Sequence, residues 1–174
     1  MILSPHHVSF TVSNLQETEA FFESALDYRR IGGGHYDLPY VKRQVGYPDA
    51  ELEIALLTYQ GQPFATTGFM IELIQYIHPK CEPTDTSTCR PGSTHLCFQV
   101  ENLRAEYQRM VALGVEFVST PNEVTSGINK GARAVYFKGP DNIRLEMIEP
   151  APPASELRVN GSQSHVIRRI QKKP

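Results

Sequence analysis

Two histidines and two glutamates of this 174-residue chain form two copies of one pair, each in the same sequence context. His7 opens the run HVSFTVSNL and His95 opens HLCFQVENL, so that His, Phe, Val and Asn-Leu recur at the same offsets. Each copy later contains an apolar segment with an interior glutamate, which is Glu72 in FMIELI and Glu146 in IRLEMI. Two imidazoles and two carboxylates make a ligand set suited to a divalent cation. The internal repeat therefore predicts one metal site to which each copy contributes one pair.

The alternation of side chains along strands predicts which way these four residues point. In each opening strand, the histidine (His7 or His95) lies on the face opposite an apolar stripe that must pack against a helix. Glu72 and Glu146 also oppose apolar stripes, so all four side chains are expected on the sheet face without helices. Two such sheets side by side would form a cup, in which a carboxylate is costly unless it is paired or bound to metal. Cys97 is expected to line this cup and not to act as a nucleophile.

The elements that carry these residues are expected in the same order twice. For the first unit we expect a strand over 6–12, a helix over 15–27 capped by Ser13, and strands over 28–33, 51–59 and 68–77, the first of these three ending at the glycines of positions 32–34. The excursion over 35–50 has room for one further short strand over 41–45. For the second unit we expect a strand over 93–100, a helix over 102–113, and strands over 115–119, 132–138 and 143–149, with a loop over 120–131.

This order predicts an α+β fold in a single domain over residues 1–150. Two βαβββ modules, 5–77 and 93–150, would form a cupped mixed sheet with the helices outside. A turn-rich linker over 78–92 joins them. The tail over 151–174 begins with Ala-Pro-Pro-Ala and is expected to be an appendage outside the core.

Composition excludes several classes of protein. Charged residues make up 21% of the chain and the net charge is -2, which argues against a general nucleic-acid binder. No apolar run reaches the length of a membrane span, and the first residues do not read as a signal peptide. Three cysteines are an odd number without zinc-ribbon spacing, which favours a reducing compartment. The expected location is the cytoplasm, without nucleic-acid or membrane partners.

Several of these segments together resemble the vicinal oxygen chelate (VOC) superfamily, which has the glyoxalase/bleomycin resistance/dioxygenase fold. This group includes glyoxalase I, methylmalonyl-CoA epimerase, extradiol dioxygenases and fosfomycin-resistance proteins. The resemblance covers residues 5–150 and rests on the phrases opened by His7 and His95 and on the segment around Glu72. It also rests on GPDN at 139–142, where the family commonly has Asp-Pro-Asp-Gly.

The resemblance implies that His7, Glu72, His95 and Glu146 hold one divalent metal ion, which is nickel, cobalt, manganese, zinc or iron. Glu146 would shuttle a proton beside a metal-chelated carbonyl, and Glu72, the second catalytic carboxylate, would mainly hold the ion. The implied protein is a glyoxalase-like isomerase, epimerase or lyase, a homodimer that acts on a small molecule with vicinal oxygens. Two alternatives stay open: an extradiol-type dioxygenase or metal-dependent transferase, and a non-catalytic binding or resistance protein of the bleomycin-sequestering type. Whether one chain or two chains complete the site also stays open.

Two segments are expected to contact the substrate. The loop over 126–131 contains two glycines and precedes a strand, as a mobile lid would. The stretch over 35–50 is rich in groups that hold acidic or aromatic molecules, namely His35, Tyr36, Tyr40, Lys42, Arg43 and Tyr47.

Overall fold

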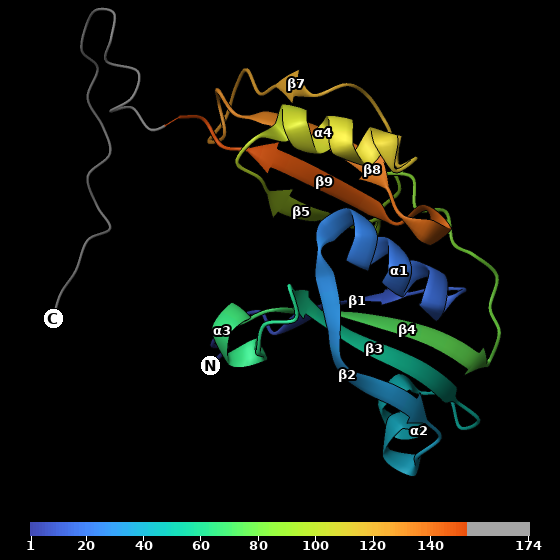
Figure 1. Ribbon diagram of the computed structural model, residues 1–174. Coiled ribbons are helices and arrows are strands. Elements are labelled where there is room, and N and C mark those ends of the chain that lie inside the picture. Colours follow the sequence, from blue (N-terminus) through green and yellow to red (C-terminus); the bar gives the residue numbers. More distant parts are fainter. Residues whose placement is uncertain (153–174) are drawn as a thin grey trace, which may run out of the picture.

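The computed structural model describes residues 1–152 and contains two sheets, each accompanied by one long helix (Figure 1). The first unit contains β1 (His7–Thr11), α1 (Leu15–Leu26), β2 (Tyr28–Tyr36), α2 (Pro39–Val45), β3 (Glu51–Tyr59), α3 (Phe64–Thr67) and β4 (Met70–His78). The second contains β5 (Leu96–Gln99), α4 (Leu103–Ala112), β6 (Glu116–Phe117), β7 (Asn122–Glu123), β8 (Arg133–Lys138), the 3-10 turn η1 (Pro140–Asn142) and β9 (Arg144–Glu149). The predicted tail lies outside the described residues from position 153 onward. Within the described part, no helix has the length and apolar character needed to cross a membrane.

Both sheets repeat one strand order. The first runs β1-β4-β3-β2, and the second runs β5-β9-β8-β6 with β7 also paired to β8. In each sheet the opening strand is parallel to the closing strand, and the other neighbours are antiparallel. The α+β class and the two repeated units are therefore confirmed. His7 is the first residue of β1, and His95 immediately precedes β5. Each of these two strands lies at an edge of its sheet.

The stretch between β2 and β3 differs from the prediction. Residues 41–45, expected as a short strand, belong to helix α2. Pro39 stands in the first turn, where its fixed φ suits a helix and its missing N–H costs nothing. The helix ends at Gly46, which takes a left-handed conformation with φ of 80°. Pro39 at the start of the helix and Gly46 at its end therefore decide the local structure, and the apolar alternation between them does not.

The glycines at 32–34 do not break strand β2, because they allow it to continue against β3. Gly33 has φ of 108°, and a β-carbon there would overlap the carbonyl oxygen of Ile54. A register shift between Arg30 and Gly32 accompanies this close approach of the two backbones. Strand β2 therefore extends three residues beyond its predicted end.

We expect Gly33→Ala to lower the free energy of unfolding by more than about 1 kcal/mol, because both the positive φ and the contact with β3 resist a side chain. Urea denaturation followed by circular dichroism measures this loss. Gly32→Ala is the matched control, since its added carbon meets Leu56 Cδ1 at 3.6 Å, an ordinary contact. A loss for Gly33→Ala no greater than that for Gly32→Ala would contradict the close approach.

The two long helices begin in the same way. Asn14 and Asn102 cap α1 and α4 by accepting hydrogen bonds from the backbone N–H three residues on, at 3.1 and 3.0 Å. Ser13, the predicted cap of α1, instead binds the carboxylate of Asp141 in η1. Its N–H lies 2.7 Å from Oδ2 and its hydroxyl 2.6 Å from Oδ1. This contact joins the two units directly.

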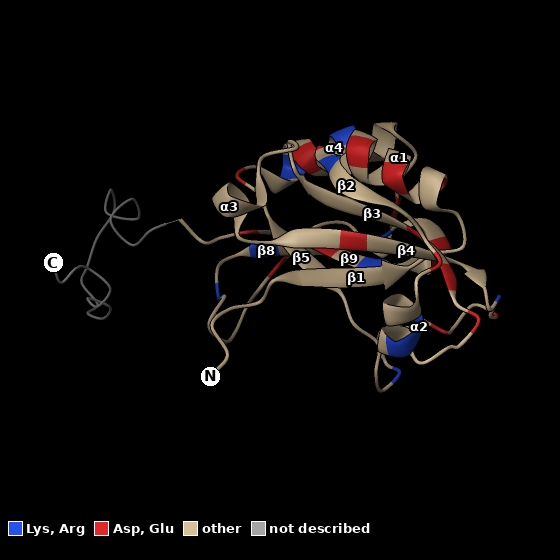
Figure 2. Ribbon diagram, turned by 90° about the horizontal axis from the view of Figure 1, so that it is seen from below, with Lys and Arg blue, Asp and Glu red and all other residues tan. Residues whose placement is uncertain are grey.

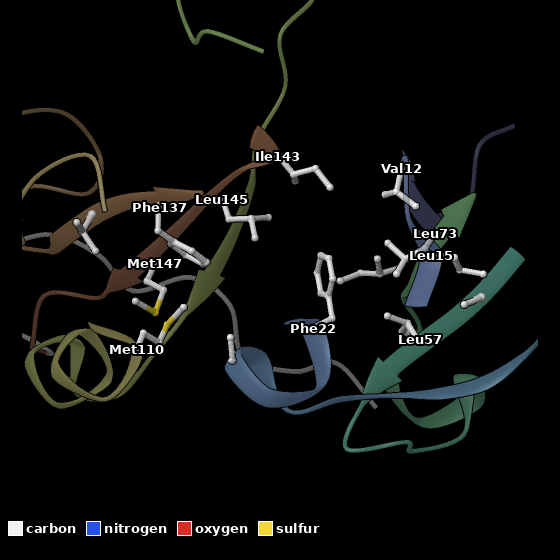
Figure 3. Close-up of a cluster of buried hydrophobic side chains, with 14 of the residues drawn as sticks. Val12, Leu15, Phe22, Leu57, Leu73, Met110, Phe137, Ile143, Leu145 and Met147 are labelled. Atoms are coloured by element: carbon white, nitrogen blue, oxygen red, sulfur yellow. The ribbon is translucent and has the colours of Figure 1, made fainter. Parts of the chain in front are cut away.

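A single hydrophobic core lies between the two sheets. Phe22 of α1 is fully buried and stands between them, with the second sheet on one side and the first on the other (Figure 3). The core takes up the helix-facing side chains of both sheets, which include Leu57, Ile71, Leu73, Val135, Phe137, Leu145 and Met147. Because the core takes one face of each sheet, the opposite faces, which carry the predicted ligands, point away from it.

Candidate metal centre

His7 and Glu72 form the first of two histidine–carboxylate pairs. They lie on β1 and β4, where His7 is in register with Met70 and Ser9 with Glu72. Nε2 of His7 is 3.6 Å from Oε2 of Glu72, and the carboxylate side chain is 21% exposed. Both strands direct their alternate residues into the core. The pair therefore lies on the outward face of the first sheet, as the strand pattern predicts.

His95 and Glu146 form the second pair in the same way. Nε2 of His95 is 3.1 Å from Oε2 of Glu146, whose side chain is 15% exposed. Glu146 lies in register between Cys97 of β5 and Tyr136 of β8. The Tyr136 hydroxyl is 3.3 Å from Nε2 of His95. Sequence reasoning missed Tyr136, although the alternation that selected Glu146 also places this tyrosine on the same face.

The thiol of Cys97 and the phenol of Tyr136, which flank Glu146 across the strands, are uncharged at neutral pH. Burial, followed by the nearby Glu146 carboxylate, raises the pKa of the Cys97 thiol to about 12. Burial and the same carboxylate raise the pKa of the Tyr136 phenol. Cys97 is thus a thiol that lines the site and lacks the thiolate character of a nucleophile. Neither Cys97 nor Tyr136 is therefore a proton acceptor at neutral pH.

Both carboxylates fit a site that takes up a cation. Among the described residues, neither Glu72 nor Glu146 forms an ion pair with lysine or arginine, although both side chains are largely covered. A covered carboxylate without a permanent counter-charge is costly. A divalent ion bound through imidazole nitrogen and carboxylate oxygen would remove this cost.

The two pairs do not meet within one chain. In the described residues, no three side chains of the metal-binding types cluster tightly enough to hold an ion. The pairs lie on different sheets, with helix α1 between the sheets and the pair-bearing faces directed away from the shared core (Figure 1). The chain thus carries two half-sites, and their union around one ion stays a prediction.

The predicted substrate segments are placed differently from one another. Helix α2 lies on the side of the first sheet opposite α1 (Figure 2). The ring centroid of Tyr47, just after α2, lies 6.1 Å from that of Tyr76. Tyr76 is four residues from Glu72 along β4. Lys42 instead pairs with Asp37. His35 lies between Glu51 and Glu53 on the other face of the sheet, and the loop over 126–131 is exposed.

A family model of the Glyoxalase/Bleomycin resistance protein/Dioxygenase superfamily matches residues 6–137. The chain belongs to this superfamily. The match covers the first half-site and His95, and it ends before strand β9, which supplies Glu146. No curated protein matches the chain significantly.

Solved structures of the superfamily share the fold of this member. A glyoxalase family protein from Bacillus cereus has 22% identity and a TM-score of 0.69, with 87% of this chain and 97% of that one covered. Glyoxalase I from Leishmania major has 15% identity and a TM-score of 0.59, with 85% and 87% covered. The fosfomycin resistance protein FosX from Listeria monocytogenes has 18% identity and a TM-score of 0.55, with 90% and 98% covered. At these identities the likeness shows the fold alone.

Proposed function

We propose that this VOC protein is a metal-dependent isomerase, epimerase or lyase that removes a proton beside a chelated carbonyl of a small substrate. The observation that carries the proposal is the duplicated histidine–carboxylate pair, in which both carboxylates are covered and lack a permanent cation. The ligands would be His7, Glu72, His95 and Glu146. When bound, a divalent ion supplies a Lewis acid for two adjacent substrate oxygens.

The chain's own groups divide the remaining work. Glu146 would take a proton from the carbon next to the carbonyl and return it to the product. Tyr136, next to Glu146 and 3.3 Å from His95, would donate a hydrogen bond to an oxygen in the site. Glu72 would mainly hold the ion, because its cross-strand neighbours are Ser9 and Leu56 and it lacks the tyrosine that lies beside Glu146.

Two copies of the chain would complete each site. The edge strands β1 and β5 have unpaired backbone groups on one side, which favours pairing with another chain. Apolar side chains on their helix-facing sides are only partly buried, namely Val8, Phe10, Leu96 and Phe98. Placing β1 beside β5 of the partner subunit would cover these residues and bring the two kinds of half-site together. A twofold axis repeats this contact, so one dimer would hold two sites.

We expect a mixed dimer of two defective chains to bind one ion. One chain carries His7→Ala and Glu72→Ala, the other carries His95→Ala and Glu146→Ala, and two different affinity tags isolate the mixed species. If two chains share each site, the intact His7–Glu72 pair of one chain meets the intact His95–Glu146 pair of the other in one of the two sites. Metal analysis should therefore give about two ions for the wild-type dimer, about one for the mixed dimer and none for either variant alone.

A matched control removes a histidine–carboxylate pair outside the proposed site. His35→Ala with Glu53→Ala deletes a pair whose atoms lie 3.0 Å apart on the other face, and it should leave both ions bound. A mixed dimer without metal would contradict the shared site, and metal retained by either double variant would contradict the ligand set. Iron in the purified protein together with oxygen consumption on catechols would contradict the isomerase class in favour of a dioxygenase.

The cysteines bear on the expected location of the protein. Cys81, Cys89 and Cys97 are all free thiols, which suits a reducing compartment such as the cytoplasm. The expected partners are a small molecule with vicinal oxygens and a second copy of the chain.

A further inference from the structure

Two basic side chains lie on the same sheet face as Glu146. Arg144 is two residues from Glu146 on β9, so both side chains leave the strand on one face. Lys138 of β8 is the direct cross-strand partner of Arg144. On the other side, Leu96 is in register with Leu145, which puts His95 beside Arg144. One row across the sheet therefore contains His95, Arg144 and Lys138.

Most of the hydrogen-bonding capacity of Arg144 is unused. Its Nε donates a long hydrogen bond of 3.4 Å to the carbonyl oxygen of Thr86. Within residues 1–152, its two terminal nitrogens have neither a hydrogen bond nor an ion pair. The carboxylate of Asp85, next to Thr86 in the chain, is bound to Arg90 at 2.8 Å and also accepts from the Ser87 N–H.

The pairing across the strands makes this arrangement unfavourable without a ligand. Lys138 forms an ion pair with Glu116, whereas Arg144 is half-buried and forms no ion pair within residues 1–152. Like charges that face each other on neighbouring strands repel. An oxyanion bound by both terminal nitrogens of a guanidinium forms two charge-assisted hydrogen bonds. Arg144, with two terminal nitrogens that have no partner within residues 1–152, therefore offers the charge and the donors for such a group.

The first half-site has no counterpart to this cation. Met70 occupies the place next to His7 that Arg144 occupies next to His95, and it is buried. Farther along the same face, Ile74 is paired with Ile54. Both units therefore have the histidine–glutamate pair. The side chains beside the pair are cationic in the second unit and apolar in the first.

We propose that the substrate carries an oxyanion, either a carboxylate or a phosphoryl group, which Arg144 binds next to the His95–Glu146 pair. This inference rests on the proposed function, because it names the substrate class of that site. The apolar remainder of the substrate would lie against the wall formed by Met70, Ile74 and Ile54. Arg144 would then fix the direction in which the substrate lies across the two half-sites.

The first test uses the metal-free, full-length protein and inorganic phosphate. Nuclear magnetic resonance follows the side-chain Nε–H signals of Arg144 and Arg133 during a phosphate titration. Arg133 lies on the same sheet but, by strand alternation, on the opposite face, and it is exposed. The Arg144 signal should shift and saturate while the Arg133 signal stays in place. An Arg144 signal that does not respond would overturn the inference, whether or not metal binds.

The second test uses nickel-loaded protein and two acids that differ by one group. 2-Oxoglutarate and 2-oxopentanoate offer the same adjacent oxygens, and only the former has a distal carboxylate. Calorimetry should show about tenfold tighter binding of 2-oxoglutarate to the wild type. Arg144→Met, which copies the residue of the first unit, should abolish this preference without weakening 2-oxopentanoate binding, and Arg133→Met should preserve it.

The outcomes separate the two proposals. Equal affinities of the wild type for both acids would overturn the anion site. Failure of nickel to bind would instead overturn the proposed function, and the phosphate titration would still decide the role of Arg144. A folding defect in Arg144→Met is detected by circular dichroism, and the wild-type comparisons do not depend on that variant.

Discussion

Glu146→Gln is expected to lower turnover by about 10²–10⁴-fold while much of the metal stays bound. The amide keeps an oxygen that can coordinate an ion, but it cannot accept the proton that a carboxylate takes from carbon. Cys97 and Tyr136 cannot replace it at neutral pH, because the pKa values of both groups are raised. The measurement is the exchange of solvent deuterium into the carbon beside a carbonyl, followed on hemithioacetals, 2-methyl-acyl thioesters and hydroxy-ketones.

Glu72→Gln is the matched comparison on the other half-site. It makes the same chemical change next to His7, where we assign only ion binding, so its loss of activity should be clearly smaller. Metal analysis of both variants separates loss of the ion from loss of proton transfer. Equal losses at the two positions would remove Glu146 as the specific base and leave the rest of the proposal in place.

Phe22→Ala is expected to lower the free energy of unfolding by about 3–5 kcal/mol. The ring is fully buried between the two sheets, contacts other aromatic rings at Phe10, Phe21 and Tyr28, and belongs to the core shared by both units. Removing it leaves a cavity that neither sheet can fill by itself. Denaturation with urea, followed by circular dichroism and by aromatic fluorescence, measures the loss.

Phe64→Ala is a suitable control for this core substitution. Phe64 is only partly buried in the short helix α3, outside the shared core. Its ring centroid lies 4.5 Å from that of His6. Its truncation should cost clearly less than that of Phe22. Because both units share one core, the wild-type protein should unfold in a single transition. Two separate transitions would show that the units fold independently and would contradict the role given to Phe22.

The strands and the sheet faces of the four candidate ligands were predictable because period-two alternation fixes the face of a side chain without knowledge of tertiary contacts. The same pattern misassigned residues 41–45, where Pro39 and Gly46 determine a helix in spite of the apolar alternation between them. Tyr136 and Arg144 were missed for another reason. Their importance depends on register with neighbours in other strands, which one segment of sequence does not specify.

The separation of the two pairs could not be predicted from the strands alone, since it depends on how the units pack around α1. Phe21 and Phe22 are adjacent in this helix, and neighbouring helical residues point about 100° apart. Phe22 enters the shared core, and Phe21 lies against Gly139 of the second unit. An apolar face this wide was a signal that α1 packs against more than its own sheet.

The contact between Ser13 and Asp141 has a mechanical consequence. Ser13 follows the strand that begins at His7, and Asp141 lies in the turn before the strand that carries Glu146. The chain therefore has one half-site on either side of a hydrogen-bonded pivot formed by these two residues. In the proposed dimer those two half-sites belong to different active sites, so a displacement at one site would reach the other through this pivot without any change of fold.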